Sequence, residues 1–587
     1  MWKIFKHLKR AEIIMIGIST LTVIGQVYLT LRIPDFMADI TRLVQTEGSE
    51  LSEVFRNGIW MLFCALGVMV LAVITGYFAA RVATSFAKEL RRQVFNKTLS
   101  FSMAEINKFS TASLITRSTN DITQIQMIFA MGMQVMIQAP ILAIWAIIRI
   151  LGRGTEWSIA TAVAVAVLLL MISINIIFAL PKFQVIQKLT DNLNRIIREH
   201  LLGIRVVHAY NADDYQEDKF EKANVDVMKT NIFVNRIMTV TMPGIMLIMQ
   251  CLTLSYYLIG ARLINNSVMP EKIDIFANMV VFSAYGVQVI MAFMMLAMTF
   301  IMLPRAAVSA KRINEILTTE LTINDGDLID SPYDIQGEIE FKNVCFRYPD
   351  AEEAVLDEIN FSIKHGETVA FIGSTGSGKS TLINLIPRFY DATEGEILVD
   401  GLNVREYKQS ALLEKIGYVS QKAILFTGTV KTNVDYGKNH SQSMTEKDVR
   451  RAIEIAQGKD FVEKMEGGYD ALIAQGGTNV SGGQKQRLSI ARAIGRRPEI
   501  FIFDDSFSAL DYKTDRILRS VLKQETAGST TIIVAQRIGT IKNADKIIVL
   551  DEGKMVGMGT HTELLAGCKT YQEIAYSQLS KEELGNE

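Results

Sequence analysis

Six long apolar stretches in the first half of the chain constrain its fold more than any other feature. A helix rises about 1.5 Å per residue and a hydrocarbon core is about 30 Å thick, so roughly twenty apolar residues cross a bilayer. Hydrophobic residues make up 49% of the 587-residue chain, a high share for a protein without a membrane part. The predicted spans are Ile13 to Ile33, Gly58 to Ala80, Met127 to Ile150, Trp157 to Leu180, Met238 to Ile264 and Ile275 to Leu303.

The charges around these spans predict their orientation. Basic residues precede the first span and follow the second, whereas the segment between them, from Pro34 to Asn57, is rich in Asp and Glu. Because cytoplasmic loops carry the excess of Lys and Arg, both chain termini are expected in the cytoplasm. The first apolar run is too long for a signal peptide and has no small-residue cleavage site. We therefore expect a multi-pass protein of the plasma (inner) membrane.

A phosphate-binding loop follows in the second half of the chain. The residues from Gly373 to Ser380 fit the pattern G-x-x-x-x-G-K-[ST], between an apolar run at Thr368 to Ile372 and a helical pattern at Leu382. The loop backbone and the helix N-terminus favour phosphate, and lysine and serine at the end of the motif suit the terminal phosphates and magnesium. The predicted phosphate-binding residues are Gly373, Ser374, Thr375, Gly376, Ser377, Gly378, Lys379, Ser380 and the adjoining Thr381.

Two later segments strengthen this prediction. An unbroken apolar run from Ile500 ends in Asp504, as expected of a buried parallel strand that carries a magnesium-binding carboxylate. About twenty residues before it, a short polar motif opens a helical pattern and consists of Ser481, Gly482, Gly483 and Gln484.

In their order along the chain, the phosphate loop, the Ser481 motif and the Asp504 strand resemble the ATP-binding cassette family of transporters. The resemblance implies an ATP site with Mg²⁺, in which Tyr348 stacks on the adenine and the Ser481 to Gln484 signature binds the ATP of a partner domain. It also implies that Gln421 serves both magnesium and catalysis, beside the metal-binding Ser380 and Asp504. The segments Ser113 to Asp121 and Glu199 to Arg205 resemble the intracellular loops of the family's exporters.

Two positions depart from the family pattern. The residue after the magnesium carboxylate is normally Glu, which activates the attacking water, and here it is Asp505. A late His that contacts the terminal phosphate is replaced by Gln536, which can donate a hydrogen bond but cannot carry charge. A carboxylate displaced by about 1 Å can cost on the order of a hundredfold in rate. We therefore expect a site that binds ATP and hydrolyses it slowly, with Asp505, Gln536 and Gln421 as its catalytic residues.

The expected architecture combines a helical membrane domain with an α/β domain. Residues 1–310 are predicted to form six transmembrane helices of the type IV exporter kind with long intracellular loops, and residues 311–336 a polar linker. Residues 337–587 are predicted to form a P-loop ATPase domain with a helical subdomain from about Val430 to Arg497.

The resemblance favours one half of a heterodimeric exporter that moves hydrophobic drugs or lipids, with a second half-exporter as partner and the lipid bilayer around it. A methionine-rich sixth span suits varied apolar ligands, although methionines that merely fill packed positions explain it equally well. The alternative function is an ATP-gated channel or a regulatory subunit of a transporter for peptide or lipid. A net charge of −1 argues against a nucleic-acid partner.

Overall fold

The computed structural model describes residues 4, 6–46, 48–151, 154–269, 271–437 and 444–578. The chain forms two compact units. The first comprises Met1–Leu99 and Ala112–Thr319, and the second comprises Ser100–Thr111 and Glu320–Glu587.

The first unit is built from long helices. Six helical stretches among the described residues are long and apolar enough to cross a membrane, which confirms the predicted number of spans. The third stretch is interrupted by a π-helical turn at Ile128–Gly132 and includes the short helices α5 (Thr111–Ser118) and α6 (Asn120–Met127). The long helices are α2 (Arg10–Gln45), α3 (Leu51–Leu99), α7 (Met133–Leu151), α8 (Thr155–Leu202), α10 (Asp213–Asn266) and α11 (Glu271–Thr318).

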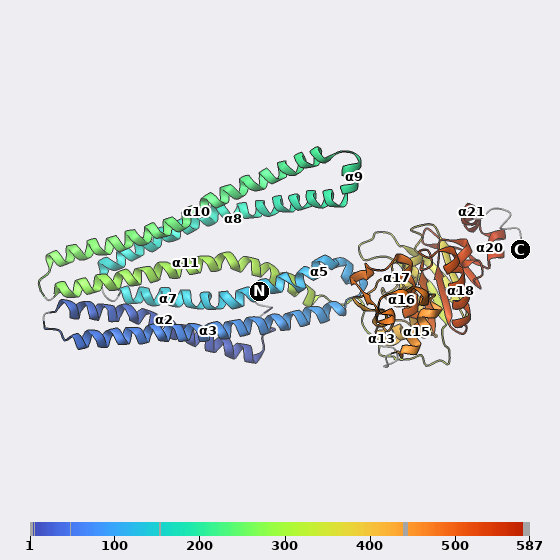
Figure 1. Ribbon diagram of the computed structural model, residues 1–587, viewed down its shortest axis with the longest axis horizontal. Coiled ribbons are helices and arrows are strands. Elements are labelled where there is room, and N and C mark those ends of the chain that lie inside the picture. The colour runs from blue at the N-terminus through green and yellow to red at the C-terminus, as the bar shows by residue number, and fades with distance from the viewer. Residues whose placement is uncertain are drawn as a thin grey trace. The chain divides into compact units, whose positions relative to one another are not determined.

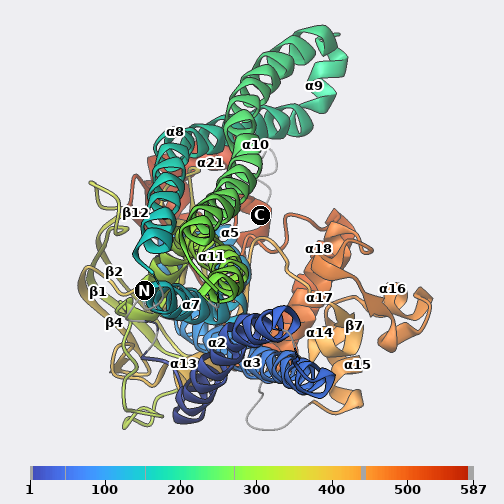
Figure 2. The same cartoon turned by 90° about the vertical axis from the view of Figure 1, so that its left-hand side faces the viewer.

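Helix α11 lies at the centre of this unit, where it packs against α2, α7 and α10 (Figures 1 and 2). Aromatic stacking also joins α11 to α8, with the rings of Trp157 and Phe282 4.8 Å apart and nearly parallel. Helices α8 and α10 run side by side as a long hairpin, and the short helix α9 (Ile204–Ala209) closes its tip (Figure 1).

A buried polar contact joins α2 to α11. The Tyr285 hydroxyl donates to Asp35 Oδ1 at 2.8 Å and to the carbonyl of Leu31 at 3.0 Å, and Arg149 of α7 lies 3.5 Å from the other Asp35 oxygen. A charged group removed from water needs such partners, because an isolated one would be expensive to bury. The contact therefore fixes three helices in one register.

The second unit contains two main sheets. Its larger sheet has the strand order β12-β11-β3-β10-β9-β6, in which β11, β3, β10, β9 and β6 are parallel, and the smaller antiparallel sheet has the order β2-β1-β4-β5. The larger sheet comprises β3 (Thr368–Gly373), β6 (Ile416–Val419), β9 (Ile500–Asp504), β10 (Thr530–Val534), β11 (Lys546–Asp551) and β12 (Lys554–Gly559). The smaller sheet comprises β1 (Ile339–Phe346), β2 (Leu356–Ile363), β4 (Glu394–Val399) and β5 (Leu402–Asn403).

A second apolar cluster in this unit contains residues of the predicted helical segment, Val430 to Arg497, together with Phe501 and Phe503 of β9. The first helix after the phosphate-loop glycines is α12 (Lys379–Leu385). The last two described helices are α20 (His561–Gly567) and α21 (Lys569–Gln578). The remaining helices are α4 (Met103–Phe109), α13 (Gln409–Glu414), α14 (Val430–Val434), α15 (Glu446–Ile455), α16 (Lys459–Lys464), α17 (Gly482–Gly495), α18 (Tyr512–Glu525) and α19 (Ile538–Ile541), and a short ribbon pairs β7 (Gly428–Thr429) with β8 (Leu472–Ile473).

One strand is shorter than its apolar pattern suggests. The sequence favours a strand from Thr530 to Gln536, but β10 ends at Val534. The Ala535 amide still donates to the carbonyl of Phe371, after which the backbone leaves the sheet to enter α19. Gln536 therefore lies in a loop and is exposed.

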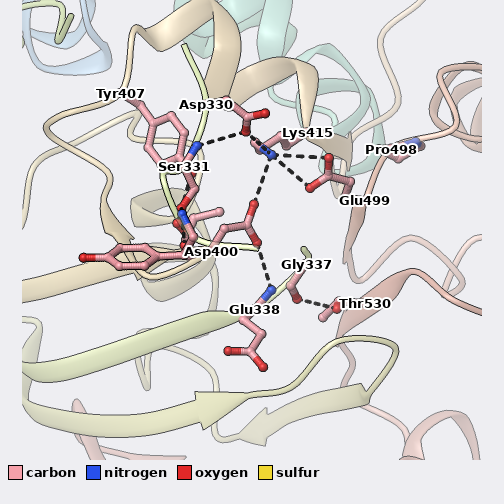
Figure 3. A network of polar contacts seen from close by, with 12 residues as sticks. Asp330, Ser331, Gly337, Glu338, Asp400, Tyr407, Lys415, Pro498, Glu499 and Thr530 are labelled. Atoms are coloured by element: carbon pink, nitrogen blue, oxygen red, sulfur yellow. Dashed lines mark hydrogen bonds and ion pairs between the residues drawn. The ribbon is translucent and has the colours of Figure 1, made fainter. Parts of the chain in front are cut away.

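Lys415 is the centre of an ion-pair network in the second unit (Figure 3). Its ammonium lies 3.0 Å from Asp330, 3.1 Å from the fully buried Asp400 and 3.2 Å from Glu499. Burial alone would lower the pKa of Lys415, but hydrogen bonds to Asp330 and Asp400 outweigh it and the pKa is raised. Asp400 also accepts from the amide of Glu338, at the start of β1. The network thus ties the segment before β1 to the sheets.

We predict that Lys415→Met destabilises the second unit strongly, because it leaves the Asp400 carboxylate buried without a counter-charge. Removing one partner of a buried pair costs roughly 3–5 kcal/mol, so the apparent melting temperature should fall by at least about 5 °C. Lys342→Met is the control, since Lys342 pairs with Glu340 at the surface and should change the melting temperature by less than about 2 °C. Equal shifts in the two variants would contradict the structural role of Lys415.

Candidate functional site

The parallel strands of the larger sheet bring distant parts of the sequence to one edge. Strand β10 pairs with β3 and with β9 in parallel, with Val534 opposite both Phe371 and Asp504. The carboxyl ends of these strands therefore meet, and this is the edge where open α/β sheets bind their ligands. The phosphate loop follows β3, Asp504 ends β9 with Asp505 just after it, and Gln536 follows β10.

The phosphate loop has the backbone that its glycines allow. A Cβ on Gly373 would collide with the carbonyl oxygen of Leu550, and Gly378 has a φ of 93°, a left-handed conformation that favours glycine. The Lys379 ammonium reaches back across the loop and donates to the carbonyls of Gly373 at 2.9 Å and Ser374 at 2.6 Å. The loop backbone thus curves around the Lys379 ammonium in a ring. The positive charge inside this ring suits a bound anion.

Ser380 and Asp504 form the polar pair next to this ring. The Ser380 hydroxyl donates to Asp504 Oδ1 at 3.0 Å, and Asp504 is buried at the end of β9. Magnesium is usually held by one or two carboxylates together with substrate phosphates and water. Among the described residues no three His, Cys, Asp or Glu side chains gather into a metal site of their own. The pair therefore fits a magnesium ion that arrives with phosphate.

The side-chain amides of Gln421 and Gln536, two of the predicted catalytic residues, both contact Asp505. Gln536 Nε2 donates to Asp505 Oδ2 at 3.1 Å, and Gln421 Nε2 lies 3.4 Å from the same oxygen. The backbone of Asp505 has a φ of 45°, a left-handed conformation that is uncommon for residues other than Gly, Asn and Asp. The structure thus brings together Asp505, Gln536 and Gln421, which lie up to 115 residues apart in the sequence.

Burial sets the electrostatics of the site. It raises the pKa of Asp504 and of Asp505 and lowers the pKa of Lys379, while the two carboxylates and the lysine partly offset each other. Each shift means that the charged form is poorly solvated. A triphosphate with its magnesium ion supplies the missing counter-charges, so the residues present fit that ligand.

Tyr348 lies beside the phosphate loop rather than free in solvent. Its hydroxyl is 3.0 Å from Thr381 Oγ1 in the first turn of α12, and its ring packs edge-on against Phe346 and Tyr390. The predicted adenine-stacking tyrosine and the last predicted phosphate-loop residue are therefore neighbours.

The signature motif forms a helix N-terminus. Ser481 caps α17 by accepting from the Gln484 amide, while Gln484 Oε1 accepts from the Ser481 amide at 2.8 Å. Such a reciprocal cap satisfies two backbone donors of the helix. Ser481 and Gly482 are exposed, and Gly483 passes close to the carbonyl of Ala509. Among the described residues, the hydrogen bonds of the Ser481 and Gln484 side chains stay within the motif.

Sequence reasoning missed further residues at this edge. Arg537 opposes the raised pKa of Asp505 by its charge. Ser508, by contrast, belongs to the family pattern, and its hydroxyl donates to the Asp505 carbonyl at 2.9 Å. Gln578, at the end of α21, donates a hydrogen bond to the backbone carbonyl of Gln536. Neither the spacing nor the residue type of Gln578 gives a signal for such a contact.

We predict that Lys379→Ala weakens ATP binding by about 10- to 100-fold, because it removes charge-assisted hydrogen bonds to phosphate. Titration of the purified full-length chain with a fluorescent ATP analogue measures this loss. The control is Lys364→Ala, an exposed lysine before β3, which should bind as the wild type does. Undiminished binding by Lys379→Ala would show that the phosphate loop is assigned wrongly.

Comparisons with known proteins agree with both units. The family model for the ABC transporter transmembrane region matches residues 13–283, and the ABC transporter model matches residues 356–508. An uncharacterized ABC transporter ATP-binding protein of Mycobacterium tuberculosis is 38% identical over 520 residues, which cover 88% of this chain and 87% of that protein. An ATP-dependent lipid A-core flippase of Hahella chejuensis is 31% identical over 86% of this chain and 85% of its own.

The fold also matches a solved structure. A bacterial Atm1-family ABC exporter with ATP bound superposes with a TM-score of 0.78 and 23% identity, covering 96% of this chain and 98% of the exporter chain. The described six apolar helices and the ATPase sheet thus have the architecture of an ABC exporter. The length and identity of the matches to the relatives above show that this chain belongs to the ABC transporter family and is an ATPase-coupled membrane transporter with the transmembrane and ATP-binding parts on one chain.

Proposed function

We propose that this chain is one half of a heterodimeric exporter of hydrophobic compounds or lipids, and that its own ATP site binds ATP with Mg²⁺ but turns it over slowly. The observation that carries the proposal is the convergence of Gln536 and Gln421 on one oxygen of Asp505. The family's longer carboxylate and its histidine are both replaced here, at side chains that touch each other.

The contacts of the site support a role for each residue. Lys379 and the loop backbone would hold the phosphates, Ser380, Asp504 and Gln421 would hold the metal ion, and Asp505 would act as the base for the attacking water. A side chain shorter by one methylene reaches less far from β9, and Gln536 supplies only a neutral donor. The intact phosphate loop supports tight binding, whereas the altered pair supports slow hydrolysis.

An exposed apolar surface supports the need for a partner subunit. At the tip of the α8 and α10 hairpin, Leu202 is 83% exposed, Tyr210 81% and Tyr215 69%. Large apolar patches outside the membrane usually mark interaction sites. Together with the exposed Ser481 and Gly482 of the signature motif, this surface supports a dimer. Two identical copies would hold only slow sites, so we infer a different second subunit.

Relatives of the chain and its charge pattern support a substrate class and an orientation in the membrane. Two relatives, from Hahella chejuensis and Yersinia pestis, are lipid A-core flippases at 31% and 30% identity, which supports a lipid or another hydrophobic substrate. Helix α11 also places Met279 and Phe282 in the apolar core of the membrane unit. The basic residues around the first two spans support cytoplasmic termini and a plasma-membrane location.

A channel or regulatory subunit is the second candidate, because a slowly hydrolysing site is also what an ATP-operated gate needs. The purified heterodimer in sealed vesicles separates the two functions. We expect ATP-dependent accumulation of a fluorescent hydrophobic dye or a labelled lipid against its gradient. An ATP-dependent ionic conductance without accumulation would contradict the exporter and support the channel.

The same vesicles test the division of labour between the two sites. In the assembled dimer the Ser481 motif serves the partner's ATP, so Ser481→Ala should lower ATPase and transport by about 10²-fold or more. Asp505→Asn affects only the slow site and should change transport by less than about threefold. If both variants were equally impaired, the two sites would not be unequal and the heterodimer proposal would fail.

A further inference from the structure

The C-terminal helix α21 shares its core with the loop that carries Gln536. We call residues 535–541 the switch segment. Ala535, Ile538 and Ile541 of this segment pack in one buried cluster with Tyr571 and Ala575 of α21. Tyr571 is fully buried, and its hydroxyl lies 2.7 Å from Nδ1 of His561 in α20. The helix is thus anchored to the domain and forms one wall of the switch segment.

Gln578, the last residue of α21, binds the switch segment by both ends of its amide. Its Nε2 donates to the carbonyl of Gln536 at 2.7 Å, and its Oε1 accepts from the amide of Ile538 at 2.9 Å. These two backbone groups lie just beyond β10, where the sheet no longer supplies partners. One side chain therefore replaces the sheet as the hydrogen-bonding partner of the backbone on both sides of Arg537.

A second clamp holds the other end of the switch segment. Arg519 of α18 donates to the carbonyl of Gly539 at 2.9 Å, and two hydrogen bonds to the buried Asp515, at 2.9 and 2.8 Å, fix its guanidinium. A planar guanidinium held in this way is well oriented. The segment is fixed at two points, and Gln536, whose backbone is held at the first of them, places its side-chain amide 3.1 Å from Asp505.

We propose that Gln578 is a positioning residue of the ATP site: by holding the backbone of Gln536 and Ile538, it places the Gln536 amide against Asp505. This inference rests on the proposed function, because it assigns a task to the same Gln536 and Asp505. It makes the C-terminal helix part of the machinery that sets the turnover of this site. A glutamine that merely ends a surface helix would not need two backbone partners some forty residues away.

Single-turnover hydrolysis tests this role in a site that turns over slowly. The purified full-length chain in nanodiscs is mixed in excess with radiolabelled ATP and Mg²⁺, which gives a maximal rate constant and a half-saturating protein concentration. Gln578→Met keeps the length of the side chain and removes both hydrogen bonds. We expect the rate constant to fall about tenfold because Gln536 loses its position, with half-saturation within about twofold because Lys379 and Tyr348 are untouched.

Gln572→Met is the matched control. Gln572 is on the same helix, and its amide also donates to a backbone carbonyl, that of Leu565 at 2.7 Å, but it does not contact the switch segment. We expect this variant to hydrolyse ATP as the wild type does. Hydrogen exchange supplies the second measurement: the Ile538 amide should lose protection in Gln578→Met and keep it in Gln572→Met.

Gln536→Ala separates the inference from the proposed function. A slow Gln536→Ala beside a normal Gln578→Met would overturn the positioning role and leave the proposed function standing. Wild-type rates in both would overturn the assignment of Gln536 and the inference with it. Equal loss of rate and of exchange protection in Gln578→Met and Gln572→Met would show that α21 matters only for folding, and would also overturn the positioning role.

Discussion

The parallel pairing of β3, β10 and β9 is the constraint on which the ATP site depends. Parallel strands end at the same edge, so the segments that follow them meet regardless of their separation in the sequence. Phe371, Val534 and Asp504 lie in one row across these strands. The residues just beyond this row are the phosphate loop, Asp505 and Gln536. A slip of one residue in this pairing would turn their side chains to the other face of the sheet.

The site is held together by charges that are poorly solvated until a ligand binds. Burial disfavours the charged forms of Lys379, Asp504 and Asp505. The charge of Lys379 only partly offsets the raised pKa of each carboxylate, and the neighbouring charge of Asp505 adds to the raised pKa of Asp504. Asp505 also has a left-handed backbone conformation, which Asp tolerates better than Glu does. Asp at this position therefore costs less backbone strain than Glu, and in the proposed slow site its carboxylate reaches less far. The replacement of Glu by Asp therefore agrees with the left-handed backbone at position 505.

Much of the fold was predictable because its signals are strong and local. Each of the six spans is a run of about twenty apolar residues, and the phosphate loop joins a strand to a helix in a fixed pattern. The end of β10 was not predictable, because Ala535 continues the apolar run of the strand although the strand itself ends at Val534 and the backbone turns toward α19. The Gln578 clamp and the Lys415 network were also beyond reach, since ordinary polar side chains become partners only through tertiary folding.

The most direct test of the slow site restores the two side chains that the family normally carries. Asp505→Glu with Gln536→His lengthens the carboxylate and supplies a titratable ring, at a backbone cost of about 1–2 kcal/mol for Glu in a left-handed conformation. The steady-state ATPase rate of the full-length chain alone should rise at least about tenfold over the wild type, with unchanged affinity for ATP. A wild-type chain that already hydrolyses ATP as fast as the double variant would contradict the central claim that this chain binds ATP at a site built to turn it over slowly.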